Sequence, residues 1–257
     1  MSEETSGRSQ LRTLLRFGMQ KLRQDGFASF VKGGIEHVRR LSIAKQAQSA
    51  FDRRYGTDTA GTIPLWKLQI RSPHHAEGVR YQASDPDFVR KAIEILQIPL
   101  ERFVYIDVGS GKGLTLLVAS EYPFRRVLGI EFAAELNAIA AENISRLMAP
   151  RCQDISSVLA DAASYRFPTE DTVLFLYNPF GKDVLKRMLD NLRSVLEQND
   201  HELYIVYSNP IFSQILDQSG FLERLDLPIG AAVYRHSPTH GVLQHDTRTH
   251  IHVVGED

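Results

Sequence analysis

The stretch YIDVGSGKGLTLL, residues 105–117, sets the interpretation of this 257-residue chain. Apolar residues lead up to an acid, Asp107, and glycine then occupies every second position, at Gly109, Gly111 and Gly113. Glycine allows a tight turn and lets another group approach the backbone closely. The stretch therefore predicts a buried strand, a turn that holds a ligand, and a helix that follows it.

The chain around this stretch alternates between short apolar runs and longer segments with helical spacing. Strands are expected at 102–108, 126–131, 156–161, 172–178 and 202–208, with helices between them at 114–122, 133–148 and 183–197. A short helix near 211–219 and two closing strands, at 221–227 and 231–235, are expected to complete the fold. The pattern predicts an α/β fold, with a doubly wound, mostly parallel seven-stranded sheet, helices on both faces and an antiparallel closing hairpin.

Four parts are expected along the chain. They are an N-terminal helical extension at 1–50, a lid or lead-in segment at 51–85, an α/β core at 86–236 and a polar tail at 237–257. The lead-in segment is rich in Gly, Thr, Pro and aromatic residues, which predicts a long loop with little regular structure. The segment ends sharply, because Ser84 or Asp85 can cap a helix that has Pro86 in its first turn.

The front of the chain is basic, although the whole chain has a net charge of −1. Residues 1–56 hold 11 lysines and arginines against five acids. The basic helices could pack on the core, bind a partner or lie on a membrane surface, and the sequence leaves these three roles open. The near-zero net charge makes nucleic acid a less expected partner than a protein or a small molecule.

The remaining bulk features predict a cytoplasmic protein. Cys152 is the only cysteine, so no disulfide can form within the chain, which fits a reducing compartment. No apolar run approaches the roughly 18 residues that would span a bilayer. The first residues, MSEETSGRSQ, are polar and lack the apolar segment of a signal peptide. Nothing in the sequence indicates an oligomeric state.

Two familiar ligands do not fit the glycine-rich turn. A phosphate-binding loop needs G-x-x-x-x-G-K-[ST], but position 106 is isoleucine and the residue after Lys112 is Gly113. A dinucleotide-binding turn needs G-x-G-x-x-G, and position 114, where the third glycine belongs, is Leu114. The turn therefore predicts neither a Walker-type nucleotide site nor a standard dinucleotide site.

The pattern D-x-G-x-G-x-G, here Asp107, Gly109, Gly111 and Gly113, resembles motif I of the class I S-adenosylmethionine-dependent methyltransferases. The resemblance covers about residues 84–235 and implies that S-adenosyl-L-methionine is the cofactor. Such a cofactor presents an amino-acid end and a sulfonium, which suits close backbone approach and a nearby carboxylate. The resemblance implies that Ser110, in the same turn, binds the cofactor and that Asp107 accepts hydrogen bonds from the cofactor's ammonium group.

Two further acids end the next two predicted strands. Glu131 lies 20 residues after Gly111, where an acid can accept hydrogen bonds from both ribose hydroxyls. Asp161 ends the third strand. The resemblance implies that Asp161 accepts a hydrogen bond from the adenine amino group and that the backbone N–H of Ala162 donates to a ring nitrogen of the adenine. Structural roles remain open for both acids, as the start of a helix for Glu131 and as a helix cap for Asp161. Acids at the carboxyl ends of successive strands point into one crevice.

The fourth predicted strand ends in LYNPFG, residues 176–181. Many amino-group methyltransferases carry N-P-P-[YF] here, and this chain has Asn178, Pro179 and Phe180 with one proline missing. The resemblance implies that Asn178 and the carbonyl beside the proline accept from the target nitrogen while the aromatic ring stacks on it. These three residues are the candidate catalytic residues, and a strand-ending turn is the structural alternative.

Tyr81, just before the capped helix, is similar in position to a tyrosine of the Dot1-related protein lysine methyltransferases. In that group the segment closes over the methionine end of the cofactor, so Tyr81 joins the cofactor-binding candidates. The Tyr-x-Pro pattern of that group is absent, because position 83 is alanine. The resemblance to the lysine enzymes is therefore looser than the resemblance to the class.

The sequence predicts a methyltransferase that transfers a methyl group to a nitrogen of a protein side chain or a small molecule. The alternative is a catalytically silent module that keeps the fold and uses the basic extension to hold a partner. Five of the nine histidines lie in residues 236–257, including a pair in HIH at 250–252. Because no cysteine or close acid pair accompanies them, a polar tail is favoured over a metal site.

Overall fold

The computed structural model describes residue 42 and residues 45–238. Most of the helical extension expected at 1–50 lies outside the described residues, as does the polar tail expected at 237–257 from residue 239 onward. No helix in the described part of the chain has the length and the apolar character needed to cross a bilayer.

The main sheet has seven strands and confirms the expected α/β architecture. The strands are β3 (Val104–Val108), β4 (Arg126–Glu131), β5 (Ile155–Leu159), β6 (Thr172–Tyr177), β7 (Leu203–Ser208), β8 (Glu223–Leu225) and β9 (Ala231–His236). Their order across the sheet is β5-β4-β3-β6-β7-β9-β8. All neighbours are parallel except β9, which is antiparallel to both β7 and β8, so the expected closing hairpin is present.

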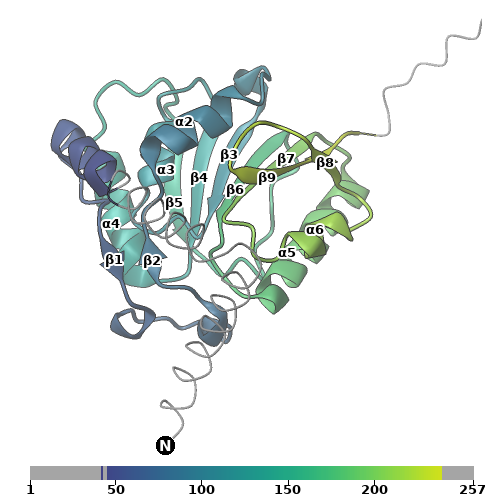
Figure 1. The fold of residues 1–257 in the computed structure, drawn as a ribbon, viewed down its shortest axis with the longest axis horizontal. Helices are drawn as coiled ribbons and strands as arrows, with labels where there is room; N and C mark the ends of the chain where they lie inside the picture. Colours follow the sequence, from purple (N-terminus) through teal and green to yellow (C-terminus); the bar gives the residue numbers. More distant parts are fainter. Residues whose placement is uncertain (1–41, 43–44, 239–257) are drawn as a thin grey trace, which may run out of the picture.

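Helices cover both faces of this sheet (Figure 1). They are α2 (Pro86–Glu94), α3 (Leu114–Ala119), α4 (Ala134–Ser145), α5 (Lys182–Gln198) and α6 (Ser213–Asp217). Strand residues alternate between two buried clusters, since successive side chains of a strand point to opposite faces. Tyr105 and Phe175 pack in the cluster with α2 and α3, whereas Ile106 and Leu174 pack in the cluster with α5.

The helix α2 begins as the sequence predicts. The side chain of Asp85 accepts a hydrogen bond from the backbone N–H of Asp87, and Pro86 is the first helical residue. Such a cap is worth about 1 kcal/mol. The helix buries Val89 and Ile93 completely or nearly so, which fixes the residues that precede it against the core.

The lead-in segment contains more regular structure than the sequence predicts. Residues 45–55 are helical, and β1 (Thr62–Ile63) pairs antiparallel with β2 (Tyr81–Gln82). Short 3-10 turns occur at η1 (Leu65–Lys67) and η2 (His75–Glu77), and a third, η3 (Leu100–Arg102), precedes β3. The segment is ordered by tertiary contacts, which local sequence patterns do not reveal.

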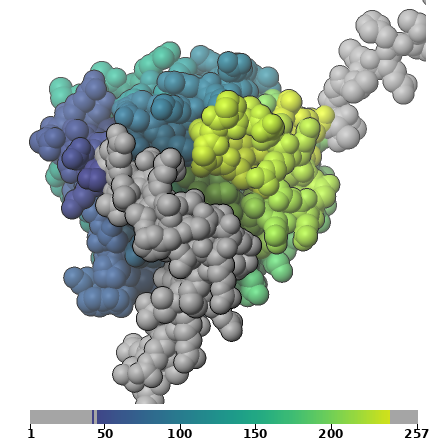
Figure 2. All heavy atoms as spheres, viewed as in Figure 1, coloured from purple at the N-terminus to yellow at the C-terminus, as the bar shows by residue number. Residues whose placement is uncertain are grey.

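The helical residues 45–55 pack on the core. Phe51 is buried, and the side-chain amide of Gln48 donates to the carbonyl of Ala83 at 2.8 Å. The hydroxyl of Tyr55 donates to the carboxylate of Glu121, two residues after α3 ends, at 2.9 Å. In the space-filling view the early residues, in purple and blue, and the late residues, in yellow-green, form opposite sides of the same face (Figure 2).

Candidate functional site

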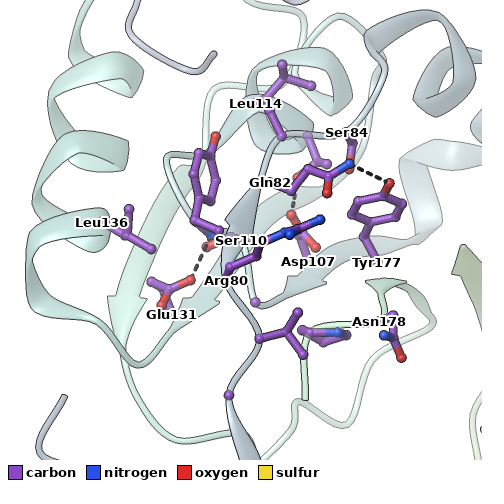
Figure 3. A pocket seen from close by; sticks show the side chains of 18 of the residues that line it. Arg80, Gln82, Ser84, Asp107, Ser110, Leu114, Glu131, Leu136, Tyr177 and Asn178 are labelled. Carbon is purple, nitrogen blue, oxygen red and sulfur yellow. Dashed lines mark hydrogen bonds between the residues drawn. The ribbon is translucent and has the colours of Figure 1, made fainter. Parts of the chain in front are cut away.

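A cleft of about 490 Å³ lies at the carboxyl ends of β3, β4 and β6. Its floor comes from the glycine-rich turn, and the lead-in residues 78–84 form its outer wall. The predicted site residues that line it are Tyr81, Asp107, Gly109, Ser110, Gly111, Glu131, Asn178 and Pro179. Figure 3 shows Glu131, Asp107 and Tyr177 arranged around this space.

The glycines of the turn are required by its geometry. Gly109, Gly111 and Gly113 have φ angles of +82°, +55° and +85°, in the left-handed region that favours glycine. A Cβ on Gly111 would overlap the ring of Tyr81, and one on Gly109 would overlap Pro179. The turn is therefore packed directly against the lead-in segment and against the residues that follow β6.

Lys112, inside the glycine-rich turn, is turned toward the lead-in segment. Its ammonium group donates to the carboxylate of Asp58 at 2.7 Å and to the carbonyl of Ala60 at 3.2 Å. It also lies 5.7 Å from the centre of the Tyr81 ring. Because the hydroxyl of Tyr81 donates to the carbonyl of Thr59, both side chains tie residues 58–60 to the turn.

Asp107 is a buried carboxylate whose hydrogen-bond partner in the described part of the chain is neutral. The hydroxyl of Thr115, in the first turn of α3, donates to it. Burial raises the pKa of Asp107 to about 7; the bond from Thr115 opposes this rise and the nearby charge of Glu131 adds to it. A ligand that brings a positive charge to this carboxylate would stabilise its ionised form.

Glu131 at the end of β4 is held by two backbone groups. One carboxylate oxygen accepts from the N–H of Gly111 and the other from the N–H of Ala133, both at 2.8 Å. Burial raises the pKa of Glu131, and these backbone bonds oppose the rise. Each oxygen keeps a further lone pair for a ligand hydroxyl. The hydroxyl of Ser110 is also buried and has no hydrogen-bond partner in the described part of the chain.

Asp161 follows β5 and is already bonded within the chain. Its Oδ2 accepts from the hydroxyl of Ser72 and lies 2.8 Å from Nδ1 of His74, and its Oδ1 accepts from the N–H of Ala163. Burial alone would raise the pKa of Asp161, but the bonds from Ser72 and His74 hold it below its usual range. The acid is thus engaged by the lead-in segment.

The space beside Asp161 is small. A cavity of about 30 Å³ lies beside Asp161 and is lined by His74, Ala162 and Phe180 among others. The lining of this cavity is mostly apolar, and the carboxylate of Asp161 and the ring of His74 are its polar part.

Asn178 and Phe180, which the sequence pairs as catalytic candidates, lie in different cavities. Asn178 lines the large cleft, has a φ of +44°, and its side-chain oxygen accepts from the hydroxyl of Tyr207 at 3.0 Å. Phe180 is buried in the small cavity beside Asp161, where it pairs with Gly78 through an isolated bridge. Pro179 touches both cavities.

Several residues of the site were not found by sequence reasoning. Arg80 and Gln82 line the large cleft, and the amide of Gln82 donates to the hydroxyl of Tyr177 at 3.3 Å. Ser72 and His74 reach Asp161 from 89 and 87 residues earlier in the chain. No local spacing links these pairs, so only the folded chain brings them together.

No protein-family model matches the chain, and a comparison with curated proteins finds no match. Solved structures with a similar fold include the ribosomal protein L11 methylase of Lactobacillus delbrueckii subsp. bulgaricus, which is 17% identical, with 60% of this chain and 77% of that chain covered and a TM-score of 0.43. Another is the magnesium protoporphyrin IX methyltransferase of Synechocystis PCC 6803 with bound SAM (13% identical, 58% and 77% covered, TM-score 0.43). A third is an RNA methyltransferase of Salinibacter ruber in complex with S-adenosyl-L-homocysteine (18% identical, 64% and 97% covered, TM-score 0.38).

The sheet order and the reversed strand β9 give this chain the seven-stranded, Rossmann-like fold that the resemblance to class I methyltransferases implies. The fold places the ends of β3 and β4 side by side, because Asp107 pairs in register with Gly129 and Val108 with Ile130. The carboxylates of Asp107 and Glu131 thereby meet at one crevice, where open α/β sheets bind their ligands.

Proposed function

We propose that this chain is an S-adenosylmethionine-dependent methyltransferase that transfers a methyl group to a nitrogen. The observation that carries the proposal is the pair of buried acids, Asp107 and Glu131, on either side of a glycine-rich turn in a cleft of about 490 Å³. Each acid has lone pairs left for a ligand, and Asp107 has no cationic partner among the residues that the structure describes.

The side chains of the cleft suit the proposed cofactor. Asp107 would hold the ammonium group and Glu131 would accept from the ribose hydroxyls. Ser110 lines the same cleft, and its buried hydroxyl has no hydrogen-bond partner among the described residues. When bound, S-adenosylmethionine would supply a methyl group on a positively charged sulfur, and a nitrogen lone pair can attack its carbon while the carbon–sulfur bond breaks and the sulfur leaves neutral. The chain contributes alignment and exclusion of water around that group.

Asn178 is proposed to position the acceptor. Its side-chain oxygen accepts from Tyr207 and retains a second lone pair for an N–H of the incoming amine. A lysine acceptor would have to lose its proton, since its ordinary pKa is about 10.4. Tyr177 lines the cleft, and burial raises the pKa of its own phenol, so this wall is shielded from water and desolvation there would disfavour the charged amine.

The acceptor is proposed to be a protein side chain or a small molecule. The test has two steps. Calorimetry with S-adenosyl-L-homocysteine asks whether the cleft binds the cofactor product; no binding by folded protein would refute the proposed function. Cell extract incubated with protein and methyl-labelled cofactor then shows whether label enters protein, small molecules or nucleic acid, and binding without any transfer would indicate a silent binding module.

The Asn178→Ala variant tests the choice of nitrogen. We expect at least a tenfold loss in catalytic rate, about 1.4 kcal/mol, with little change in cofactor affinity. Asn199→Ala is the matched control, because Asn199 donates to the carbonyl of Thr169 away from the cleft. Full turnover by Asn178→Ala would show that the residue forms a structural turn and would remove the preference for nitrogen.

A further inference from the structure

Arg80 stands out among the residues that line the large cleft. It lies on the outer wall, directly before Tyr81, and its side chain is exposed. In Figure 3 its guanidinium points into the pocket, toward the side on which Asp107, Gln82 and Tyr177 lie. The described cleft lining contains no other lysine, arginine or histidine.

The backbone on both sides of Arg80 is fixed. The N–H of Val79 donates to the carbonyl of Pro179 at 3.2 Å, which ties the segment to the turn after β6. On the other side, the ring of Tyr81 packs directly on Gly111 in the glycine-rich turn. The backbone at Arg80 is therefore held between the turn after β6 and the glycine-rich turn, the two elements that bound the cleft.

The guanidinium of Arg80 makes no hydrogen bond or ion pair with any residue of the described chain. It forms no ion pair with Asp107 or Glu131, the two acids that line the same cleft, and the group on which its charge acts is the phenol of Tyr177. An arginine whose five N–H groups are free at a ligand cleft is suited to a carboxylate, which it can bind through two parallel hydrogen bonds.

We propose that Arg80 binds the carboxylate at the amino-acid end of the cofactor. This inference rests on the proposed function and on the balance between the negative charges of the cleft and those of the ligand. A carboxylate that enters a cleft with two buried acids is repelled by them unless a cation meets it. The amino-acid end of S-adenosylmethionine carries both signs, so Asp107 would match its ammonium and Arg80 its carboxylate. A carboxylate on the methyl acceptor is the other source of the same chemistry.

The test compares two ligands that differ only in this group. S-Adenosyl-L-homocysteine and its decarboxylated analogue, which keeps the ammonium and the adenosine, are titrated by calorimetry into wild type and into Arg80→Met. We expect Arg80→Met to weaken binding of S-adenosyl-L-homocysteine by about tenfold or more. Binding of the decarboxylated analogue should change by less than about twofold, because the deleted partner is absent from that ligand.

Arg71→Met is the matched control. Arg71 is an exposed arginine of the same lead-in segment that does not line the cleft, so its loss should change neither affinity. An equal loss for both ligands in Arg80→Met, or no loss for either, would overturn the assignment to the cofactor carboxylate. Failure of wild type to bind either ligand would instead refute the proposed function, so the two failures are distinguishable. A thermal melt of each variant verifies that it is folded.

Discussion

The cavities at the carboxyl ends of the strands differ in which groups hold their acids: we call the large cleft at β3 and β4 the open end, and the small cavity beside Asp161 the closed end. At the ends of β3 and β4 the cleft is open, and Glu131 is held by backbone groups of Gly111 and Ala133. Beside the end of β5 lies the smaller cavity of about 30 Å³, where Asp161 is engaged by Ser72 and His74. Glu131 thus keeps lone pairs for the proposed ligand, whereas Asp161 already accepts from side chains of the lead-in segment.

The difference follows from where the partners of each acid come from. Glu131 is oriented by the turn and helix next to it, so its geometry is a property of the sheet and its connections. Asp161 is oriented by side chains of a segment outside the sheet. If Asp161 accepts from the adenine amino group, as the sequence predicts, the ligand must compete with those bonds. A ligand would bind the first end at little cost, and at the second it would compete with the protein itself.

The largest effect is expected from crowding the open end with Gly111→Ala. A left-handed backbone costs an alanine about 1–2 kcal/mol, and the new Cβ would also push Tyr81 off the turn. We expect S-adenosyl-L-homocysteine affinity to fall by about a hundredfold or more, which is above 2.7 kcal/mol. Calorimetry and a thermal melt measure the two contributions.

Gly220→Ala separates backbone strain from crowding. Gly220 has a φ of +76° and open space around it, so its replacement adds only the strain. The two variants should lose similar stability from strain, while only Gly111→Ala should lose ligand affinity. Equal behaviour of the two would show that the contact between Tyr81 and Gly111 does not shape the site.

The next effect concerns the ribose. Glu131→Gln keeps the size of the side chain but turns one acceptor into a donor. We expect a loss of roughly tenfold to a hundredfold in S-adenosyl-L-homocysteine affinity, because charge-assisted bonds are lost. Glu135→Gln is the control, since Glu135 also accepts from a backbone N–H, that of Gln69, but lies outside the cleft. A folded Glu131→Gln with normal affinity would place the ribose elsewhere.

The strands that carry Asp107 and Glu131 are predicted well because their signals are local. Both acids follow apolar runs, and β4 covers 126–131 as expected, whereas β3 extends one residue past Asp107, to Val108. The closed end could not be predicted, because Ser72 and His74 meet Asp161 only after the chain has folded. Lys112 shows the same limit: its position in the turn is visible, but its ion pair with Asp58 spans 54 residues.

A smaller effect is expected from pH. If only ionised Asp107 binds the ammonium group, a pKa of about 7 predicts that affinity for S-adenosyl-L-homocysteine rises about tenfold between pH 6 and pH 8. Stability without ligand should move in the opposite direction. The raised pKa in the folded state contributes stability at low pH that is lost as pH rises through about 7.

Asp107→Asn should remove the pH dependence of ligand affinity and the pH dependence of stability that Asp107 causes. Its affinity should be weak and flat with pH, and its melting temperature without ligand should fall less than that of wild type between pH 5 and pH 8. Calorimetry and thermal melts at several pH values measure these slopes. A wild-type affinity that does not change over this range would mean that Asp107 is not the partner of the ammonium group.

The smallest effect is expected at the closed end, from His74→Ala. Removing His74 takes away one of the bonds that a nucleobase must displace from Asp161 and enlarges the cavity beside Ala162 and Phe180. We expect adenosine and S-adenosyl-L-homocysteine to bind a fewfold more tightly, about 1 kcal/mol, because the ligand no longer competes with that bond. His75→Ala is the control, since the side chain of His75 is exposed and contacts the carbonyl of Ser72 rather than the acid. Weaker binding by His74→Ala alone would reverse the interpretation: the histidine would then be a contact of the bound base, and the closed end would be as much a part of the site as the open one.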